Sequence, residues 1–129
     1  MPDDLAFASI TDLARALRAR RLSAVELTQF VLDRLARHGP TYNALAELTP
    51  ERALAQARRA DRWFRQGRDV SVLQGIPYGA KDLLATRGIP TRWGSPAHRR
   101  QVFDHDATVI RRLARAGAVL RSEERRVGK

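Results

Sequence analysis

The chain has 129 residues, of which 24 are basic and 14 acidic, so its formal net charge is +10. It contains no cysteine, which excludes a disulfide scaffold, a thiolate metal site and a cysteine nucleophile. Its length suits one ordinary domain, and its longest run without a charged side chain, residues 70–80, is too short for a membrane helix. Since the start also lacks a secretory signal pattern, we expect a cytoplasmic protein without membrane contacts.

The positive charge comes almost entirely from arginine, because the chain has only two lysines, Lys81 and Lys129. The arginines are spread along the expected helices and do not alternate with aromatic side chains, as a nucleic-acid stacking platform would require. We therefore favour solvated helix faces in an arginine-rich composition. The alternative is a small basic module that binds nucleic acid, or a helical interaction module.

Three amphipathic helices are expected in the first half of the chain, each with a recognisable N-terminal cap. Gly and Pro residues mark the expected ends of two of them. The expected helices are 10–20 after Ser9 and Asp12, a second from Ser23 and Glu26 to Gly39-Pro40, and a third from Thr49-Pro50-Glu51 to Gly67.

The second half of the chain changes in character at Val70. From there to Thr91 it is dense in Gly and Pro, which predicts short strands joined by turns. A further helix is expected to start with Asp106 as its cap, followed by a strand over 118–120. Strand, helix and strand in this order form a βαβ unit, so the expected fold class is α/β, with more sheet than the chain itself supplies.

Lys81 is the residue with the clearest chemical potential. It is the only lysine in the first 128 residues of a chain that otherwise uses arginine for positive charge, and lysine, unlike arginine, can lose its proton when it is buried. A neutral lysine amine can take a proton from a serine hydroxyl and thereby activate it as a nucleophile. The alternative is that Lys81 and Asp82 form a solvated surface pair.

Two other groups of residues carry weaker signals. His38, His98 and His105 lack the spacing of metal ligands, so we expect no metal and no cofactor. Trp93 either lines a substrate path or covers the sheet, and the sequence leaves both possibilities open.

A series of motifs in the second half resembles the amidase signature family. The helical part also resembles the segment that precedes these motifs in that family, so the resemblance covers residues 9–120. The matching segments are Ser23 to Leu27, Asn43-Ala44, Gly75-Ile76-Pro77 with Lys81-Asp82, Gly88-Ile89-Pro90-Thr91, Gly94-Ser95-Pro96, Asp106-Ala107-Thr108-Val109 and Ala116-Gly117-Ala118-Val119.

The resemblance implies a hydrolase with a mixed sheet flanked by helices and a Ser–cis-Ser–Lys triad that cleaves linear amides without a cofactor. Lys81 matches the lysine of that triad. The two serines belong to a Gly- and Ser-rich segment that would follow the last strand, and Ser71, Ser95 and Ser122 do not match it. We therefore expect a catalytically incomplete, N-terminal part of a stand-alone amidase or of the amidase component of a tRNA-dependent amidotransferase. The expected partners are a small amide substrate, amidotransferase subunits and tRNA.

The expected organisation is one partial domain followed by a short tail. Residues 1–120 form the N-terminal part of an amidase domain, with a helical preface over 9–67 and the start of the α/β core over 70–120. The family pattern breaks at Arg121, and residues 121–129 are what a sequencing adapter would encode if it were translated. We expect this tail to be non-native.

Overall fold

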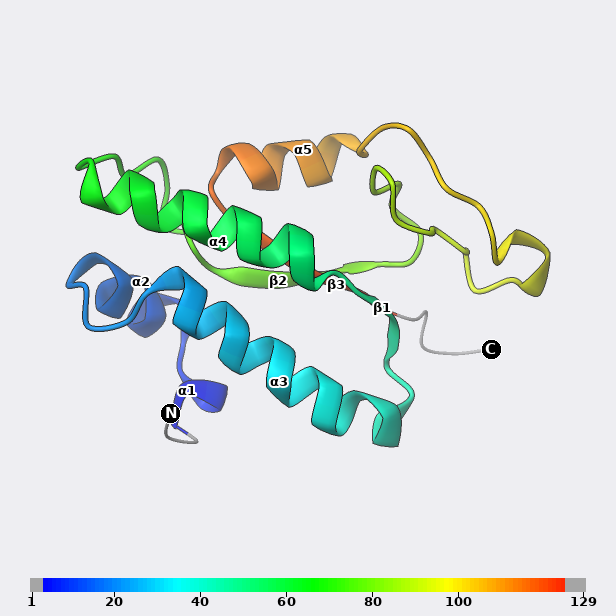
Figure 1. Ribbon diagram of the computed structural model, residues 1–129, viewed down its shortest axis with the longest axis horizontal. Coiled ribbons are helices and arrows are strands. Elements are labelled where there is room, and N and C mark those ends of the chain that lie inside the picture. The colour runs from blue at the N-terminus through cyan, green and yellow to red at the C-terminus, as the bar shows by residue number, and fades with distance from the viewer. Residues whose placement is uncertain (1–3, 125–129) are drawn as a thin grey trace.

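The computed structural model describes residues 4–124, which form five α-helices, a short 3₁₀ helix and a three-stranded sheet (Figure 1). No helix in this range is long and apolar enough to cross a membrane. The elements in chain order are α1 Asp4–Phe7, α2 Ile10–Arg18, α3 Ala24–Tyr42, β1 Leu45–Leu48, α4 Pro50–Arg65, β2 Pro77–Lys81, η1 Pro96–His98, α5 Thr108–Arg115 and β3 Val119–Glu124.

The last strand lies in the centre of the sheet, in the order β1-β3-β2. β2 pairs with β3 in parallel and α5 lies between them in the chain, so the expected βαβ unit is confirmed. β1 pairs with β3 in antiparallel orientation, which makes the sheet mixed. The α/β fold class predicted from the sequence is therefore correct.

Helices cover both faces of the sheet. Val119 packs into a core formed mainly with α2, α3 and α4, whereas the next residue, Leu120, packs with Ile110 of α5. Because successive side chains of a strand point to opposite faces, α5 covers the face opposite to α3 and α4. Figure 1 shows the loop between β2 and α5 extending past the end of the sheet at which β2 finishes.

The expected N-terminal caps of α2 and α3 are confirmed. The Ser9 hydroxyl accepts a hydrogen bond from the Asp12 backbone at 3.1 Å, and Ser23 and Glu26 form a complete capping box. α4 adds a long-range cap, because the carboxylate of Asp61 accepts the backbone N–H of Ala24 at 2.7 Å. This contact joins the start of α3 to the last turns of α4.

Three expectations about element ends were wrong. α3 continues through Pro40 to Tyr42 and ends where Asn43 takes a left-handed conformation with φ of 50°. Asp106 does not cap α5: Ala107 is the N-cap, and the Asp106 carboxylate binds Arg52 instead. The final strand runs to Glu124, beyond the expected 118–120.

The number and positions of the strands also differ from the prediction. β1 was not expected, because four half-buried residues give too short a pattern to separate a strand from a loop. From Val70 to Thr91 only β2 is a strand, with one isolated bridge between Pro90 and Val102. Of the tail predicted over 121–129, residues 121–124 belong to β3, and the remainder lies outside the described residues.

Gly117 provides a test of the packing between α5 and β3. Its φ is +84°, and a Cβ atom there would lie 2.9 Å from the Gln74 side chain and 3.0 Å from the Gln74 backbone. We expect Gly117→Ala to lower the free energy of unfolding by about 2–4 kcal/mol, through left-handed strain and overpacking together. Urea denaturation measures this change.

Gly67→Ala is the matched control. Gly67 also has a positive φ, of +72°, but apart from Gly67 and its two chain neighbours no heavy atom of the described residues lies within 4 Å of the position that a Cβ would take. Gly67→Ala should therefore lower the free energy of unfolding only through backbone strain, by about 1 kcal/mol. Equal losses in the two variants would contradict close packing of Gly117 against Gln74.

Candidate active site at the end of strand β2

Lys81 is the last residue of β2, and its side chain is exposed. β2 and β3 are parallel, so their carboxyl ends meet at the same edge of the sheet, where Lys81 is level with Glu124. In open α/β sheets this edge is where ligands usually bind. Residues 4–124 do not bury the Lys81 amine, and no serine hydroxyl in this range hydrogen-bonds to it. The structure thus places the predicted lysine at a suitable edge without placing a nucleophile beside it.

Asp82 behaves differently from Lys81, because its side chain is only 3% exposed. Its carboxylate accepts the backbone N–H of Arg92 at 2.8 Å, and its backbone carbonyl accepts the N–H of Trp93 at 3.1 Å. Its own N–H donates to the Glu124 carbonyl at 2.8 Å. The alternative of a solvated Lys81–Asp82 pair therefore fails for Asp82, which fastens the following loop to the end of the sheet.

Arg92 holds the same loop from the other side. Its guanidinium donates to the carbonyls of Arg99 at 3.0 Å and Ala46 at 3.2 Å, and to the Glu47 carboxylate at 3.3 Å. Hydrogen bonds to β1 and to the loop itself thus fix Arg92, while its N–H is fixed by Asp82. Sequence reasoning did not single out Arg92 or this role of Asp82, although both lie within or beside the recognised motifs.

Glu123 is a fully buried carboxyl group near the same edge. One oxygen hydrogen-bonds to the hydroxyl of Thr86, whereas Oε2 has no partner within the described part of the chain. Burial raises the pKa of Glu123 to about 7; the Thr86 bond opposes this rise, the charge of Asp82 adds to it, and Arg52 opposes it. Below neutral pH the group therefore keeps its proton in the folded chain, where an ordinary glutamate would lose it above about pH 4.5.

Arg52 and Asp106 form a second charged pair, between α4 and the start of α5. Both carboxylate oxygens of Asp106 accept from the guanidinium, at 3.0 and 3.2 Å, and the backbone N–H of Arg87 donates at 2.7 Å. Burial acts to raise the pKa of Asp106, but these hydrogen bonds and the nearby positive charges outweigh it and lower the pKa. The pair ties both ends of the long loop region to α4.

None of the other serines and histidines considered from the sequence hydrogen-bonds to Lys81 within residues 4–124. The Ser71 hydroxyl donates to the Ala116 carbonyl at 2.6 Å, and Ser122 is buried in β3, where it accepts from Arg121 at 2.8 Å. His38 and His105 are exposed, and His98 lies against the Trp93 ring. Within residues 4–124 no group of three or more His, Cys, Asp or Glu side chains could hold a metal ion.

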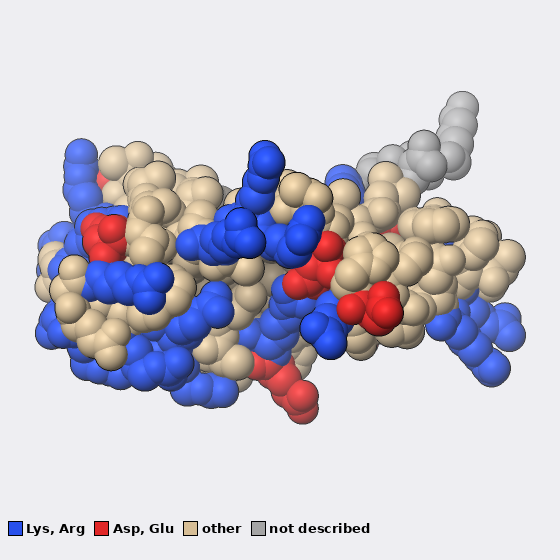
Figure 2. Space-filling view, turned by 90° about the horizontal axis from the view of Figure 1, so that it is seen from above, with Lys and Arg blue, Asp and Glu red and all other residues tan. Residues whose placement is uncertain are grey.

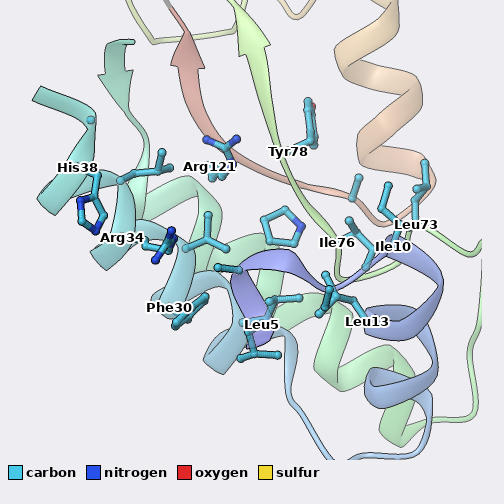
Figure 3. Close-up of a pocket in the computed structure, with 18 of the residues that line it drawn as sticks. Leu5, Ile10, Leu13, Phe30, Arg34, His38, Leu73, Ile76, Tyr78 and Arg121 are labelled. Atoms are coloured by element: carbon cyan, nitrogen blue, oxygen red, sulfur yellow. The ribbon is translucent and has the colours of Figure 1, made fainter. Parts of the chain in front are cut away.

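A separate groove of about 620 Å³ lies between the N-terminal helices and β2 (Figure 3). Its walls are mainly apolar, with Leu5, Leu13, Phe30 and Ile76 among the lining side chains. Neither Lys81 nor the loop that Asp82 fastens contributes to it. The groove is therefore distinct from the candidate active site.

On the face shown in Figure 2 the basic side chains are dispersed and do not gather in one patch. Figure 2 shows Lys and Arg in several groups over the face seen from above, with acidic side chains between some of them. Two guanidiniums, of Arg59 and Arg68, lie over the Trp63 ring at 4.9 and 4.3 Å from its centre. This distribution agrees with the preferred interpretation of solvated helix faces.

Comparison with known proteins identifies the family. The family model described as Amidase matches residues 26–122. The chain belongs to the amidase family. The A subunit of glutamyl-tRNA(Gln) amidotransferase from Cyanothece sp. is 42% identical over 113 residues, which is 88% of this chain and 23% of the relative. The same subunit from Chloroflexus aggregans is 44% identical over 117 residues, covering 91% and 24%.

Solved structures agree with this assignment. Native peptide amidase from Stenotrophomonas maltophilia superimposes with a TM-score of 0.87 and 37% identity, over 95% of this chain and 26% of that one. A fatty acid amide hydrolase gives a TM-score of 0.82 at 26% identity, over 96% and 22%. The chain spans about a quarter of the length of these amidases. The resemblance inferred from the motifs is thus confirmed, and the alternative of a nucleic-acid-binding or helical interaction module gains no support.

Glu123 allows a test by pH. Since its pKa is raised from 4.5 to about 7 on folding, the folded chain binds more protons than the unfolded chain between these values. Stability from this group is therefore fully present below pH 4.5 and is lost as pH rises through 7, by about 3 kcal/mol in all. Urea denaturation across this range should show the decline.

Glu123→Gln separates this effect from other titrations, because it keeps the shape and removes the ionisable proton. We expect the stability difference, wild type minus variant, to fall steadily from pH 4.5 to 7 and then level off. Parallel stability curves for the two proteins would contradict a proton held at Glu123.

Proposed function

We propose that this chain supplies the lysine-bearing part of an enzyme that cleaves carboxamide C–N bonds. The observation that carries the proposal is the position of Lys81: it lies within the segment that matches the amidase family, at the carboxyl end of a strand parallel to its neighbour. The order of motifs around it supports the assignment, because the same lysine position in the family belongs to the Ser–cis-Ser–Lys triad.

The proposed role of Lys81 is proton transfer. Its neutral amine would take a proton through a bridging serine from the nucleophilic serine, which attacks the carboxamide carbon and forms an acyl-enzyme. Ammonia or an amine leaves with a proton, and water then hydrolyses the ester bond. Backbone N–H groups of a Gly-rich loop would stabilise the negative oxygen. The serines and this loop match no segment of this sequence, so the chain alone is proposed to be inactive.

The proposed setting follows from the relatives. Two of them are subunits of an enzyme named for glutamyl-tRNA(Gln), and others are named as amidases. We propose a small-molecule amide as the substrate of the whole enzyme, in the cytoplasm, with amidotransferase subunits and tRNA as partners if it belongs to the first group. The tail from Arg121 onward is proposed to be foreign to the enzyme.

The first test uses the chain as it is. We expect no release of ammonia from glutamine, or from a C-terminally amidated peptide, above that of buffer, because a base without a nucleophile cannot form an acyl-enzyme. A coupled glutamate dehydrogenase assay measures the ammonia. Turnover that disappears in Lys81→Ala would contradict the proposed incompleteness.

The role of Lys81 itself requires the missing segment. Residues 1–120 joined to the matching remainder of the Stenotrophomonas maltophilia peptide amidase should hydrolyse an amidated peptide. In that hybrid, Lys81→Ala and Lys81→Arg should each lower kcat by at least about a thousandfold, since arginine keeps the charge but cannot give up its proton. Exposed Arg100→Lys is the control. Full activity in Lys81→Arg would overturn the proton-transfer role.

A further inference from the structure

Trp93 is an exposed indole held in an unusual backbone conformation. Its φ is 54°, in the left-handed region that residues other than Gly rarely adopt. The relative solvent exposure of the residue is 42%. Strain of this kind persists only where the surroundings fix it, and it is concentrated at functional positions. The hydrogen bonds that hold Trp93 in this conformation therefore indicate where it acts.

Those contacts place Trp93 beside the candidate active site. Its N–H donates to the carbonyl of Asp82, the residue that follows Lys81, at 3.1 Å. The preceding residue, Arg92, donates to the Asp82 carboxylate at 2.8 Å. Two neighbouring backbone bonds thus lock the Trp93 position to the end of β2, one residue from Lys81.

The indole belongs to a row of rings. It lies 4.8 Å from the His98 ring and 6.2 Å from the Phe103 ring, and Phe103 in turn lies 5.4 Å from the His105 ring. The ring planes are tilted to one another by 57°, 37° and 59°, and all three separations fall in the range of interacting aromatic pairs. The four rings come from one loop, between β2 and α5, and Trp93 lies between His98 and Phe103 in the row.

Trp93 does not cover the sheet. It belongs to neither of the two apolar clusters that pack on the faces of β3, and its ring partners are all in its own loop. Of the two roles left open by the sequence, sheet cover is therefore excluded for the described chain. An exposed ring that packs on two other rings, on a backbone fixed one residue from the candidate base, is suited to bind a ligand there.

We propose that Trp93, supported by His98 and Phe103, forms an aromatic wall that binds the flat apolar group of an amide substrate next to Lys81. This rests on the proposed function and adds a substrate class: carboxamides with an aromatic group near the scissile bond. Ring stacking on the indole would favour such amides over aliphatic ones of similar size by roughly two- to tenfold in affinity.

Binding can be measured on the chain without turnover. Trp63→Phe leaves Trp93 as the sole tryptophan, and reductive ¹³C-methylation labels the lysine amines, with Lys81→Arg identifying the Lys81 signal. N-acetylphenylalaninamide should quench Trp93 fluorescence and shift the Lys81 methyl resonance with the same Kd. N-acetylleucinamide, the aliphatic match, should bind two- to tenfold more weakly.

Trp93→Gly is the deciding variant, because glycine accepts a φ of 54° without strain and the loop should keep its fold. It should lose the preference for the aromatic amide, whereas Trp93→Phe should keep most of it. An unchanged preference in Trp93→Gly, no saturable binding, or a Trp93 response without a Lys81 shift would each overturn the proposal. None of these results bears on whether Lys81 is catalytic, which the hybrid enzyme decides through kcat.

Discussion

The structure depends on the central strand, β3, whose backbone groups need hydrogen-bond partners along both edges. β3 has β2 along one edge and β1 along the other, but β1 is short and reaches only as far as Ser122. At Leu120 two side chains of the α4 region take its place: the Thr49 hydroxyl donates to the Leu120 carbonyl at 2.9 Å, and the Gln56 amide oxygen accepts its N–H at 2.8 Å. These two side chains thus join α4 to the sheet, and they give partners to backbone groups of Leu120 that would otherwise be buried without any.

Because β3 is central, the side chains near its end are also buried, and polar ones there need partners. Ser122 and Glu123 are fully buried, and Glu123 carries an oxygen without a partner in the described chain. Burial raises the pKa of Glu123 to about 7, so the carboxyl holds its proton only below neutral pH, and the charged form is unfavourable at this central strand position. Such a mismatch is what we expect where a sequence has not been selected together with its neighbours, as proposed for the tail from Arg121. Asp82, one strand away, shows the contrast: it is also buried, but its carboxylate and carbonyl bind the adjoining loop, and its N–H binds β3.

Local signals predicted the local structure, and non-local contacts account for what the sequence missed. Ser23 and Glu26 predict the start of α3 because the cap involves four consecutive residues. Asp106 looks like a cap for the same reason, but Arg52, more than fifty residues away, competes for its carboxylate. β1 is recognisable only through β3, since its own residues 45–48 are half-buried and show no alternation. At the site, the motif series identified Lys81. The roles of Asp82 and Arg92 depend on a loop that folds back onto the sheet, and the spacing of residues in the sequence does not predict those contacts.

The strand order has a consequence for how the chain folds during synthesis. β1 and β2 leave the ribosome first, yet neither pairs with the other, and both wait for β3, which is made last. The helices α3 and α4, joined by the bond from the Ala24 N–H to Asp61, are both made before β2. At synthesis rates of about 5–20 residues per second, the interval between the end of β2 and the end of β3 lasts several seconds. For that time the edge of β2 that pairs with β3 lacks its partner strand, and its backbone groups are open to pairing with other chains.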